Sequence, residues 1–281
     1  RAGCAVSTTS RTLTTSNRVW CRVRIACAVE YDGSGFSGWQ RQDHARSVQG
    51  DVEAALSRVA NHAVQIFCAG RTDAGVHATW QVIHFETRAE RSDRSWVLGA
   101  NANLSKDAGL LWAQPVDSDF HARFSAQSRR YRYAILNRSQ ASPLLRQRAV
   151  WCHAALDEGR MQAAANELVG EHDFSSYRAL ACQAKSPVRT VHRLTVQRSG
   201  DFLYLDIEAN AFLHHMVRNI AGVLMSIGRG DREPDWAREV LEHRDRTRGG
   251  VTAPACGLYM VGVNYPQKYG IGPTGGLPVF G

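Results

Sequence analysis

Hydrophobic and polar residues alternate along several short segments of the chain, which is the pattern of β-strands. In the first of these segments, at 23–31, every second residue is large and apolar or aromatic: Val23, Ile25, Cys27, Val29 and Tyr31. A period of two places these side chains on one face, so we expect a half-buried strand. Comparable patterns predict further strands at 64–69, 80–86, 109–116, 129–137, 189–198, 202–210 and 258–265.

Other segments place apolar residues three and four positions apart, which is the spacing of one face of a helix. Ser47 is a residue type that caps helices, and this spacing follows it as far as Ala63. A long helix is predicted at 211–228, and a helix at 157–169 is expected to have Gly170 as its C-terminal cap. Shorter helices are predicted at 93–101 and 234–243.

Strands outnumber helices, and several neighbouring strands are close in sequence. We therefore predict an α+β fold with a largely antiparallel sheet. Both halves carry a strand–helix–strand pattern, which suits two similar subdomains. We place them at 22–130 and 131–267, after a leader at 1–21 and before an extended tail at 268–281. The leader is rich in Ser, Thr and Arg, which fits either an organellar transit peptide or a disordered segment.

The composition is that of a soluble globular protein, with 44% hydrophobic and 21% charged residues in 281. The net charge of +8 favours a polyanionic partner such as nucleic acid, although a solvated basic surface would give the same charge. The seven cysteines have no Cys-x-x-Cys spacing and form no zinc pattern, so we expect free thiols in a reducing compartment. The apolar runs are too short to cross a bilayer.

A single carboxylate, Asp73, lies between Gly70 and Gly75, just after a predicted strand. Asp and Gly are ordinary turn residues, so a structural turn is one interpretation. Glycine also lets a ligand approach the backbone closely, so the loop could present Asp73 to a substrate. Arg71, two residues earlier, could pair with this carboxylate or with a phosphate.

The predicted strand at 129–137 begins with alternating arginines and tyrosines. Tyr131 and Tyr133 share one face, and Arg130 and Arg132 share the other. Such a strand suits a stacked base with flanking phosphates, but a buried tyrosine face opposite a solvated arginine face would have the same sequence.

The predicted helix at 211–228 carries Arg218 away from its apolar stripe, where it is free to meet a carboxylate. The pair His214 and His215 invites a metal-site interpretation. Adjacent residues of a helix point about 100° apart, so we reject a shared metal ion.

Several motifs together resemble the tRNA pseudouridine synthase A family, over about residues 23–267. The most specific is Gly-Arg-Thr-Asp-Ala-Gly-Val-His, at 70–77. The others occur in the expected order: Tyr-Asp-Gly at 31–33 with Gly-Trp-Gln-Arg-Gln at 38–42, Phe-His-Ala-Arg-Phe at 120–124, and Ala-Pro-Ala at 253–255 with Gly-Leu-Tyr at 257–259.

The resemblance implies the pseudouridine synthase fold with a central active-site cleft, and it implies a role for each matching residue. Asp73 is the catalytic nucleophile, and Arg218 pairs with it. Arg71 helps to hold the target nucleotide out of the stack. Tyr131 stacks on the uracil and is a candidate for later proton removal, while Leu258 packs in the active site.

The resemblance also implies that the substrate is tRNA, modified at uridines 38 to 40 of the anticodon arm, and that the protein is a homodimer. The isomerisation requires no cofactor or metal, and we expect the protein in the cytoplasm. Two alternatives stay open. One is a non-catalytic RNA-binding protein. The other is a base glycosylase, which needs a second carboxylate, for which Asp32 and Glu86 are the nearest candidates.

Overall fold

The computed structural model describes residues 22–272 and 276–280. The strands are β1 (Val23–Tyr31), β2 (Ile66–Cys68), β3 (His77–Thr87), β4 (Ala108–Val116), β5 (Ser128–Asn137), β6 (Val150–Cys152), β7 (Gly170–Asp173), β8 (Val188–Ser199), β9 (Phe202–Ala209) and β10 (Leu258–Asn264). The helices are α1 (Val48–Ala60), α2 (Asp93–Asn101), α3 (Glu158–Asn166), α4 (Met216–Gly228) and α5 (Trp236–His243). The predicted leader lies outside the described residues.

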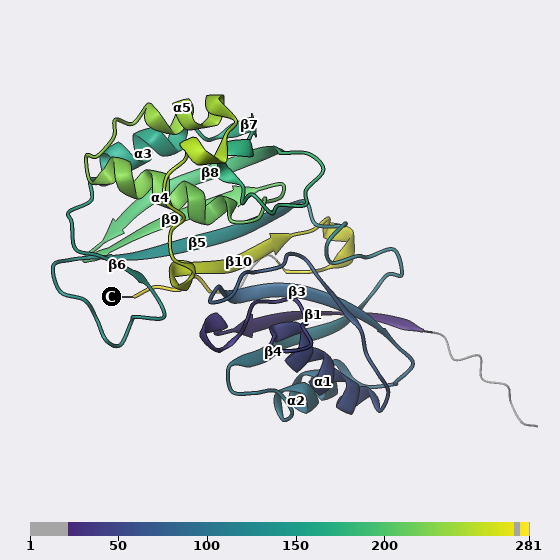
Figure 1. Cartoon of the computed structure of the whole chain (residues 1–281). Coiled ribbons are helices and arrows are strands. Elements are labelled where there is room, and N and C mark those ends of the chain that lie inside the picture. Colours follow the sequence, from purple (N-terminus) through teal and green to yellow (C-terminus); the bar gives the residue numbers. More distant parts are fainter. Residues whose placement is uncertain (1–21, 273–275, 281) are drawn as a thin grey trace, which may run out of the picture.

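All ten strands of this part of the chain belong to one sheet, shown in Figure 1. Its order is β4-β1-β3-β10-β5-β9-β8-β7, with β2 beside β3 and β6 beside β5. The β3–β10 and β5–β6 pairs are parallel, and the other pairs are antiparallel. The predicted α+β fold with a largely antiparallel sheet is confirmed.

The helices form two groups at opposite ends of the sheet (Figure 1). α1 and α2 pack together near β4, while α3 packs on β8 and α4. The centre of the sheet lies between these groups, where His77 of β3 pairs with Tyr259 of β10. No helix of the described residues is long and apolar enough to span a membrane.

Strand β1 is buried on both faces, which corrects the predicted half-buried strand. Ala26 and Ala28, on the face expected to be polar, are fully buried. The strand pairs with β3 on one side and β4 on the other, so it lies within the sheet. The second buried face carries small alanines. Alanine is also common on exposed strand faces, so the sequence pattern does not predict that this face is buried.

Two helix ends differ from the sequence-based expectation. Helix α4 begins at Met216 rather than at 211, because His215 adopts the left-handed conformation with φ of +62°. Helix α3 ends at Asn166, and Gly170 instead begins β7 with φ of +109°. The cap of α1 is confirmed, since the Ser47 hydroxyl accepts a hydrogen bond from the Gly50 amide at 3.2 Å.

The described part of the tail lies against the sheet without forming a strand. The Pro278 carbonyl accepts a hydrogen bond from Arg132 of β5 at 3.2 Å. Phe280 exchanges hydrogen bonds with the Tyr204 hydroxyl of β9, its amide donating at 2.8 Å and its carbonyl accepting at 3.1 Å. Residues 276–280 contain no helix or strand, and the predicted tail begins with a 3₁₀ turn at Gln267–Tyr269.

Candidate active site

The loop between β2 and β3 carries Asp73 and is held by neighbouring segments. The Trp39 amide donates to the Thr72 carbonyl at 3.0 Å, and the Thr72 and Tyr31 hydroxyls share a hydrogen bond of 2.8 Å. Gly38 has a φ of +96°, and a Cβ there would lie 3.0 Å from the Thr72 carbonyl oxygen. Only glycine combines this conformation with such a close approach. The loop is therefore fixed through Thr72, which leaves the Asp73 carboxylate available to other partners.

The Asp73 carboxylate contacts three side chains from the segment that starts α4. Arg218 donates from Nη1 to Oδ2 at 3.0 Å. His214 Nε2 lies 3.3 Å from Oδ1, and His215 Nε2 lies 3.3 Å from Oδ2. The Asp73 side chain is 23% exposed, so a substrate can still reach it. The predicted meeting of Arg218 and Asp73 is present in the structure.

The sequence predicts both histidines on a helix and pointing apart, and this is wrong. They precede α4, and the left-handed backbone at His215 brings the two ring centroids to 4.0 Å. One ligand atom each from Asp73, His214 and His215 lies within 4.8 Å of the others. Zn²⁺ accepts such a donor set. The Arg218 guanidinium on the same carboxylate opposes cation binding by charge repulsion.

His215 is a neutral neighbour of the Asp73 carboxylate near neutral pH. Burial lowers its pKa below the ordinary value, although the Asp73 carboxylate acts to raise it. The nearby His214, Arg218 and Arg246 lower the pKa of His215 further. A neutral imidazole still carries one N–H, so His215 can orient the carboxylate without adding a charge.

Tyr131 lies beneath the Asp73 loop and is nearly buried, with 8% of its surface exposed. Its ring packs edge-to-face on Phe212, with centroids 5.0 Å apart. Burial raises the pKa of its hydroxyl well above the ordinary value; the Asp73 carboxylate raises it too, while Arg129 opposes the shift. The hydroxyl is therefore neutral at physiological pH. This state favours the predicted stacking role over proton removal by a phenolate.

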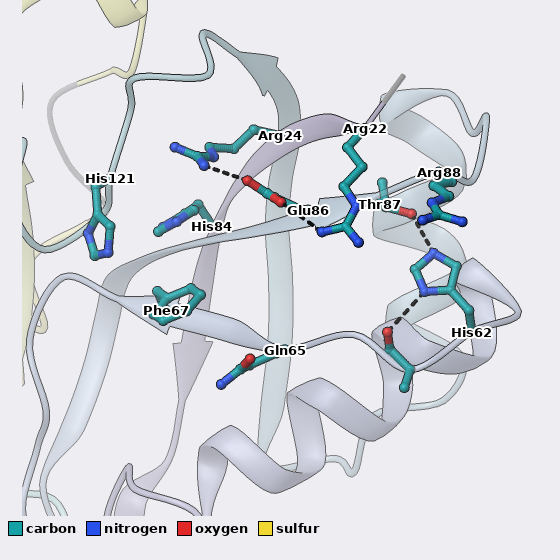
Figure 2. Close-up of a pocket in the computed structure, with 11 residues that line it drawn as sticks. Arg22, Arg24, His62, Gln65, Phe67, His84, Glu86, Thr87, Arg88 and His121 are labelled. Atoms are coloured by element: carbon teal, nitrogen blue, oxygen red, sulfur yellow. Dashed lines mark hydrogen bonds and ion pairs between the residues drawn. The ribbon is translucent and has the colours of Figure 1, made fainter. Parts of the chain in front are cut away.

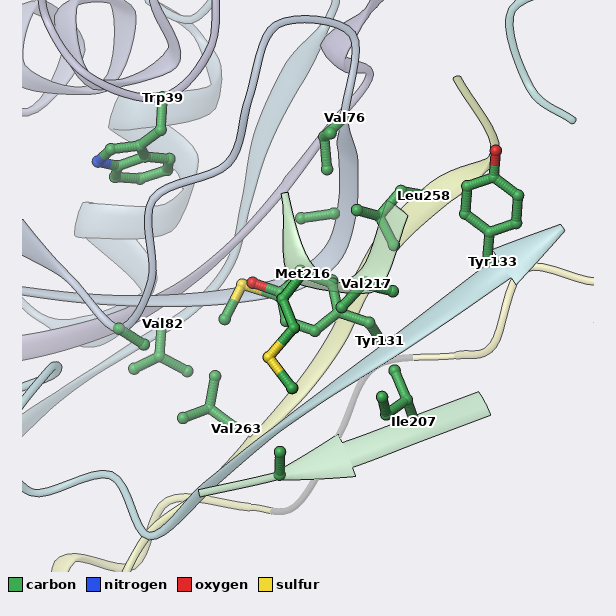
Figure 3. Packing of buried hydrophobic residues seen from close by; sticks show 14 of the residues in the cluster. Trp39, Val76, Val82, Tyr131, Tyr133, Ile207, Met216, Val217, Leu258 and Val263 are labelled. Carbon is green, nitrogen blue, oxygen red and sulfur yellow. The ribbon is translucent and has the colours of Figure 1, made fainter. Parts of the chain in front are cut away.

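The predicted closing motif holds Arg218 in place. The Ala253 carbonyl accepts a hydrogen bond from Arg218 Nε at 2.8 Å, and the Tyr133 hydroxyl donates to Pro254 at 2.8 Å. Leu258 is buried and belongs to the same apolar cluster as Tyr131, as Figure 3 shows. Leu258 begins β10 and pairs with Tyr133 of β5, and its packing in the active site stays a prediction.

Arg71 is exposed and makes no ion pair or side-chain hydrogen bond within residues 22–272 and 276–280. Its guanidinium therefore has no structural role in this part of the chain. The structural ion pair with Asp73 that the sequence leaves open is not formed. An exposed arginine two residues from Asp73 is free to meet an RNA backbone.

The arginines of β5 have structural partners, so Arg132 lies neither on a solvated face nor free to meet a phosphate, the two interpretations that the sequence left open. Arg132 binds Asp206 through two hydrogen bonds of 2.7 and 2.8 Å. Arg129 is also buried and donates to the Ala69 carbonyl at 3.1 Å, just before the Asp73 loop. Arg130 lies 3.9 Å from Glu208. The alternation along β5 marks a buried tyrosine face and a second face of internal ion pairs.

Both candidate acids for a glycosylase are held by arginines of their own. Asp32 pairs with Arg148 at 2.6 Å and accepts a hydrogen bond from the Ser34 amide at 3.0 Å. Glu86 pairs with Arg24 at 2.5 Å. Asp32 also caps the short 3₁₀ turn at Gly33–Gly35.

The sequence did not predict the two histidines as partners of Asp73. The available signal was their position, three and four residues before Arg218, in a segment that also had to reach the Asp73 loop. In a helix that started at 211 the two rings would point away from each other, so the predicted helix hides their proximity.

Comparisons with known proteins agree with this arrangement. A family model described as tRNA pseudouridine synthase matches residues 27–125 and 164–266. The tRNA pseudouridine synthase A of Methylococcus capsulatus is 57% identical over 249 residues, which cover 89% of this chain and 92% of the relative. The proteins of that name from Nitrosococcus oceani and Coxiella burnetii are 58% and 54% identical, over 88% of this chain and 95% and 94% of their own lengths. Matches of this extent show common descent along nearly the whole fold. The chain belongs to the tRNA pseudouridine synthase family.

Proposed function

We propose that this protein isomerises uridine to pseudouridine at positions 38, 39 and 40 of the anticodon arm of tRNA, with Asp73 as the nucleophile. The observation that carries the proposal is the position of Asp73, on an anchored loop with Arg218 at 3.0 Å. Its side chain is 23% exposed, while the Arg218 side chain that holds it is 16% exposed, so the carboxylate is oriented and still accessible to a bound substrate.

The reaction breaks the N1–C1′ bond of uridine and forms a C5–C1′ bond after the base has turned. The hydrogen at C5 leaves as a proton, and N1 gains one, so the reaction involves no net oxidation or hydrolysis. One carboxylate is sufficient if it attacks the nucleotide and is later released. The reaction therefore matches a site with a single aspartate and requires no cofactor.

The surrounding residues have distinct roles in this proposal. Arg218 and the two histidines orient the Asp73 carboxylate. Arg71 extends into the RNA and helps to keep the uridine out of the stem, since a paired base must be extruded before reaction. Tyr131 stacks on the uracil, which requires Phe212 to move from its ring. Leu258 packs beneath the site.

The wider assembly is part of the same proposal. We propose a homodimer that works in the cytoplasm, with subdomains at 22–130 and 131–267. Asp73 then comes from the first subdomain and Arg218 from the second, so that the active site forms only when both are folded together. The net charge of +8 supports a polyanionic substrate.

The two alternatives predict different chemistry. A non-catalytic RNA-binding protein would have no use for a carboxylate placed where phosphates would repel it. A glycosylase would require a second reactive carboxylate, whereas Asp32 and Glu86 are each paired with an arginine. Neither alternative accounts for Asp73 and Arg218 as well as the isomerase does.

The test uses tRNA transcripts with tritium at C5 of uridine and follows tritium release, because the new C5–C1′ bond must expel that hydrogen. Three transcripts each keep one uridine at position 38, 39 or 40 and have cytidine at the other two. We expect release from each transcript and none when all three positions are cytidine. Release that persists without these uridines would contradict the assigned positions, and free uracil among the products would identify a glycosylase.

A further inference from the structure

A cavity of about 660 Å³ lies on the first half of the molecule, beside β2 and the end of β3. Figure 2 shows Phe67, His84 and His121 on one side of it and Arg22 and Arg88 on the other. None of these residues contacts the Asp73 carboxylate. The cavity is therefore a surface feature that the proposed reaction does not use.

The aromatic residues of this cavity continue onto the exposed surface. Phe67 is 45% exposed and stacks on His84 at 20°, with ring centroids 5.2 Å apart. His121 lies 4.6 Å from His84 and 4.3 Å from Phe124, which is 76% exposed. Two exposed phenylalanines connected through histidine rings form an apolar surface with flat faces, which is unusual on a protein that has no partner there.

The loop that carries Phe124 is held in place by the histidines. The Ala122 amide donates to His84 Nδ1 at 3.1 Å, and the Arg123 and Phe124 amides donate to His121 Nδ1 at 3.1 and 3.3 Å. Burial lowers the pKa of His84 to about 4, so its ring is neutral at physiological pH. The aromatic surface is thus formed before any ligand arrives, and its centre carries no charge.

Arginines surround this aromatic surface. Arg22, Arg88 and Arg123 are exposed. Glu86 is the acid lining the cavity, and it is paired with Arg24 at 2.5 Å and with Arg22 at 3.5 Å, so Arg88 and Arg123 are the rim arginines without an ion pair in the described residues. The remaining charge at the rim is positive, which is complementary to a phosphate backbone.

We propose that this aromatic–arginine surface, made of Phe67, Phe124, Arg22, Arg88 and Arg123, binds an unpaired nucleotide of the RNA substrate outside the active site. The base stacks on the phenylalanines, and the neighbouring phosphates meet the arginines. The proposal rests on RNA being the substrate, as stated above. Phe67 and Asp73 are six positions apart in the chain, a span of at most about 20 Å, so one RNA molecule can reach both.

The test compares two variants of this surface with two matched controls on α2. The variants are Phe67→Ala combined with Phe124→Ala, and Arg88→Glu. The controls are Leu98→Ala, at an apolar residue that is 56% exposed, and Arg94→Glu, at an exposed arginine with no side-chain partner in the described chain. The measurements are the tRNA Kd at several salt concentrations, and KM and kcat from tritium release.

We expect the double phenylalanine variant to raise Kd and KM about tenfold with kcat within twofold of wild type, because stacking affects binding and not the reacting atoms. Arg88→Glu should raise Kd about fivefold at low salt and reduce its salt dependence. Both controls should stay within about twofold of wild type.

Wild-type Kd and KM in the double phenylalanine variant would overturn the proposal. Dissociation of a dimer with unchanged RNA affinity would also overturn it, and would assign the surface to a second copy of this chain. If wild-type protein binds tRNA but releases no tritium, the isomerase proposal fails, whereas the Kd comparison still decides whether this surface binds RNA.

Discussion

Two arginine–aspartate pairs in this protein have the same chemistry and different surroundings. Arg132 and Asp206 form two short hydrogen bonds, their side chains are 7% and 13% exposed, and the guanidinium lies 4.5 Å from the Tyr204 ring. Arg218 reaches Asp73 through one hydrogen bond of 3.0 Å and also donates to the Ala253 carbonyl. The first pair satisfies its partners completely, whereas the second leaves part of the carboxylate free.

The difference indicates how the fold separates stability from function. A buried arginine that loses its carboxylate is left as an uncompensated charge, so the Arg132–Asp206 pair matters for folding. The Asp73 carboxylate remains accessible, with its orientation set by one arginine and two histidines. Mutations in the Arg132–Asp206 pair should therefore reduce stability, whereas mutations in the Arg218–Asp73 pair should reduce activity.

The largest effect expected on stability follows from removing Asp206. Asp206→Ala should lower the free energy of unfolding by about 3 to 5 kcal/mol, because Arg132 stays buried without its partner. Urea unfolding measures this change. Glu242→Gln is the control, since that acid forms an exposed pair with Arg238, and it should change stability by less than about 1 kcal/mol.

The folded fraction of Asp206→Ala should still isomerise uridine at a rate within about threefold of wild type. A loss of activity in fully folded protein would show that the two pairs do not have separate roles. A stability loss below about 1 kcal/mol would contradict the structural role of Arg132.

A smaller effect, on rate and not on folding, is expected from Arg218→Lys. Lysine keeps the positive charge but cannot contact both Asp73 and the Ala253 carbonyl with the fixed geometry of a guanidinium. We expect kcat to fall about 100-fold, with the free energy of unfolding within about 1 kcal/mol of wild type. Arg229→Lys, at the residue that caps the C-terminal end of the same helix and pairs with the exposed Asp231, is the control and should keep its kcat.

The smallest effect is expected at His215, and it depends on pH. Its pKa is lowered, so the ring is neutral at pH 7 and takes up a proton only below its ordinary range, near 6.5. The resulting imidazolium would add a second cation beside Asp73, together with Arg218, and weaken its attack. We expect kcat/KM of wild type to fall severalfold between pH 7 and pH 5.

His215→Gln keeps a hydrogen-bond donor but has no proton to gain in this range. Its pH profile should be flatter than that of wild type on the acid side, while its rate at pH 7 stays within about tenfold. Identical profiles for the two proteins would exclude His215 as the source of the acid limb.

The elements that the sequence predicts well are those whose pattern is local. The strands at 109–116 and 129–137 and the helix at 93–101 match β4, β5 and α2 to within a residue, since alternation and helical spacing depend on neighbouring positions. The Asp73 loop was also identifiable, because its glycines and its acid occur in one short motif. Arg218 was identifiable because helical spacing places it away from the apolar stripe of its helix.

Features that depend on distant partners could not be predicted. The sequence predicts an exposed Arg132, because only the register of β5 against β9 places Asp206 opposite it. The parallel contact of β3 with β10 joins segments about 180 residues apart in sequence. The left-handed His215 is a conformation that histidine adopts rarely, and it depends on the contact with Asp73 across the sheet.

The most direct test of the account is single-turnover tritium release by wild type and Asp73→Asn, each with saturating C5-labelled tRNA. Asparagine has the same shape and cannot act as the nucleophile. We predict that release slows by at least about 10⁴-fold, while the variant is folded and binds tRNA no more weakly than wild type. Release by Asp73→Asn within about tenfold of the wild-type rate would contradict the assignment of Asp73 and, with it, the functional role of its pair with Arg218.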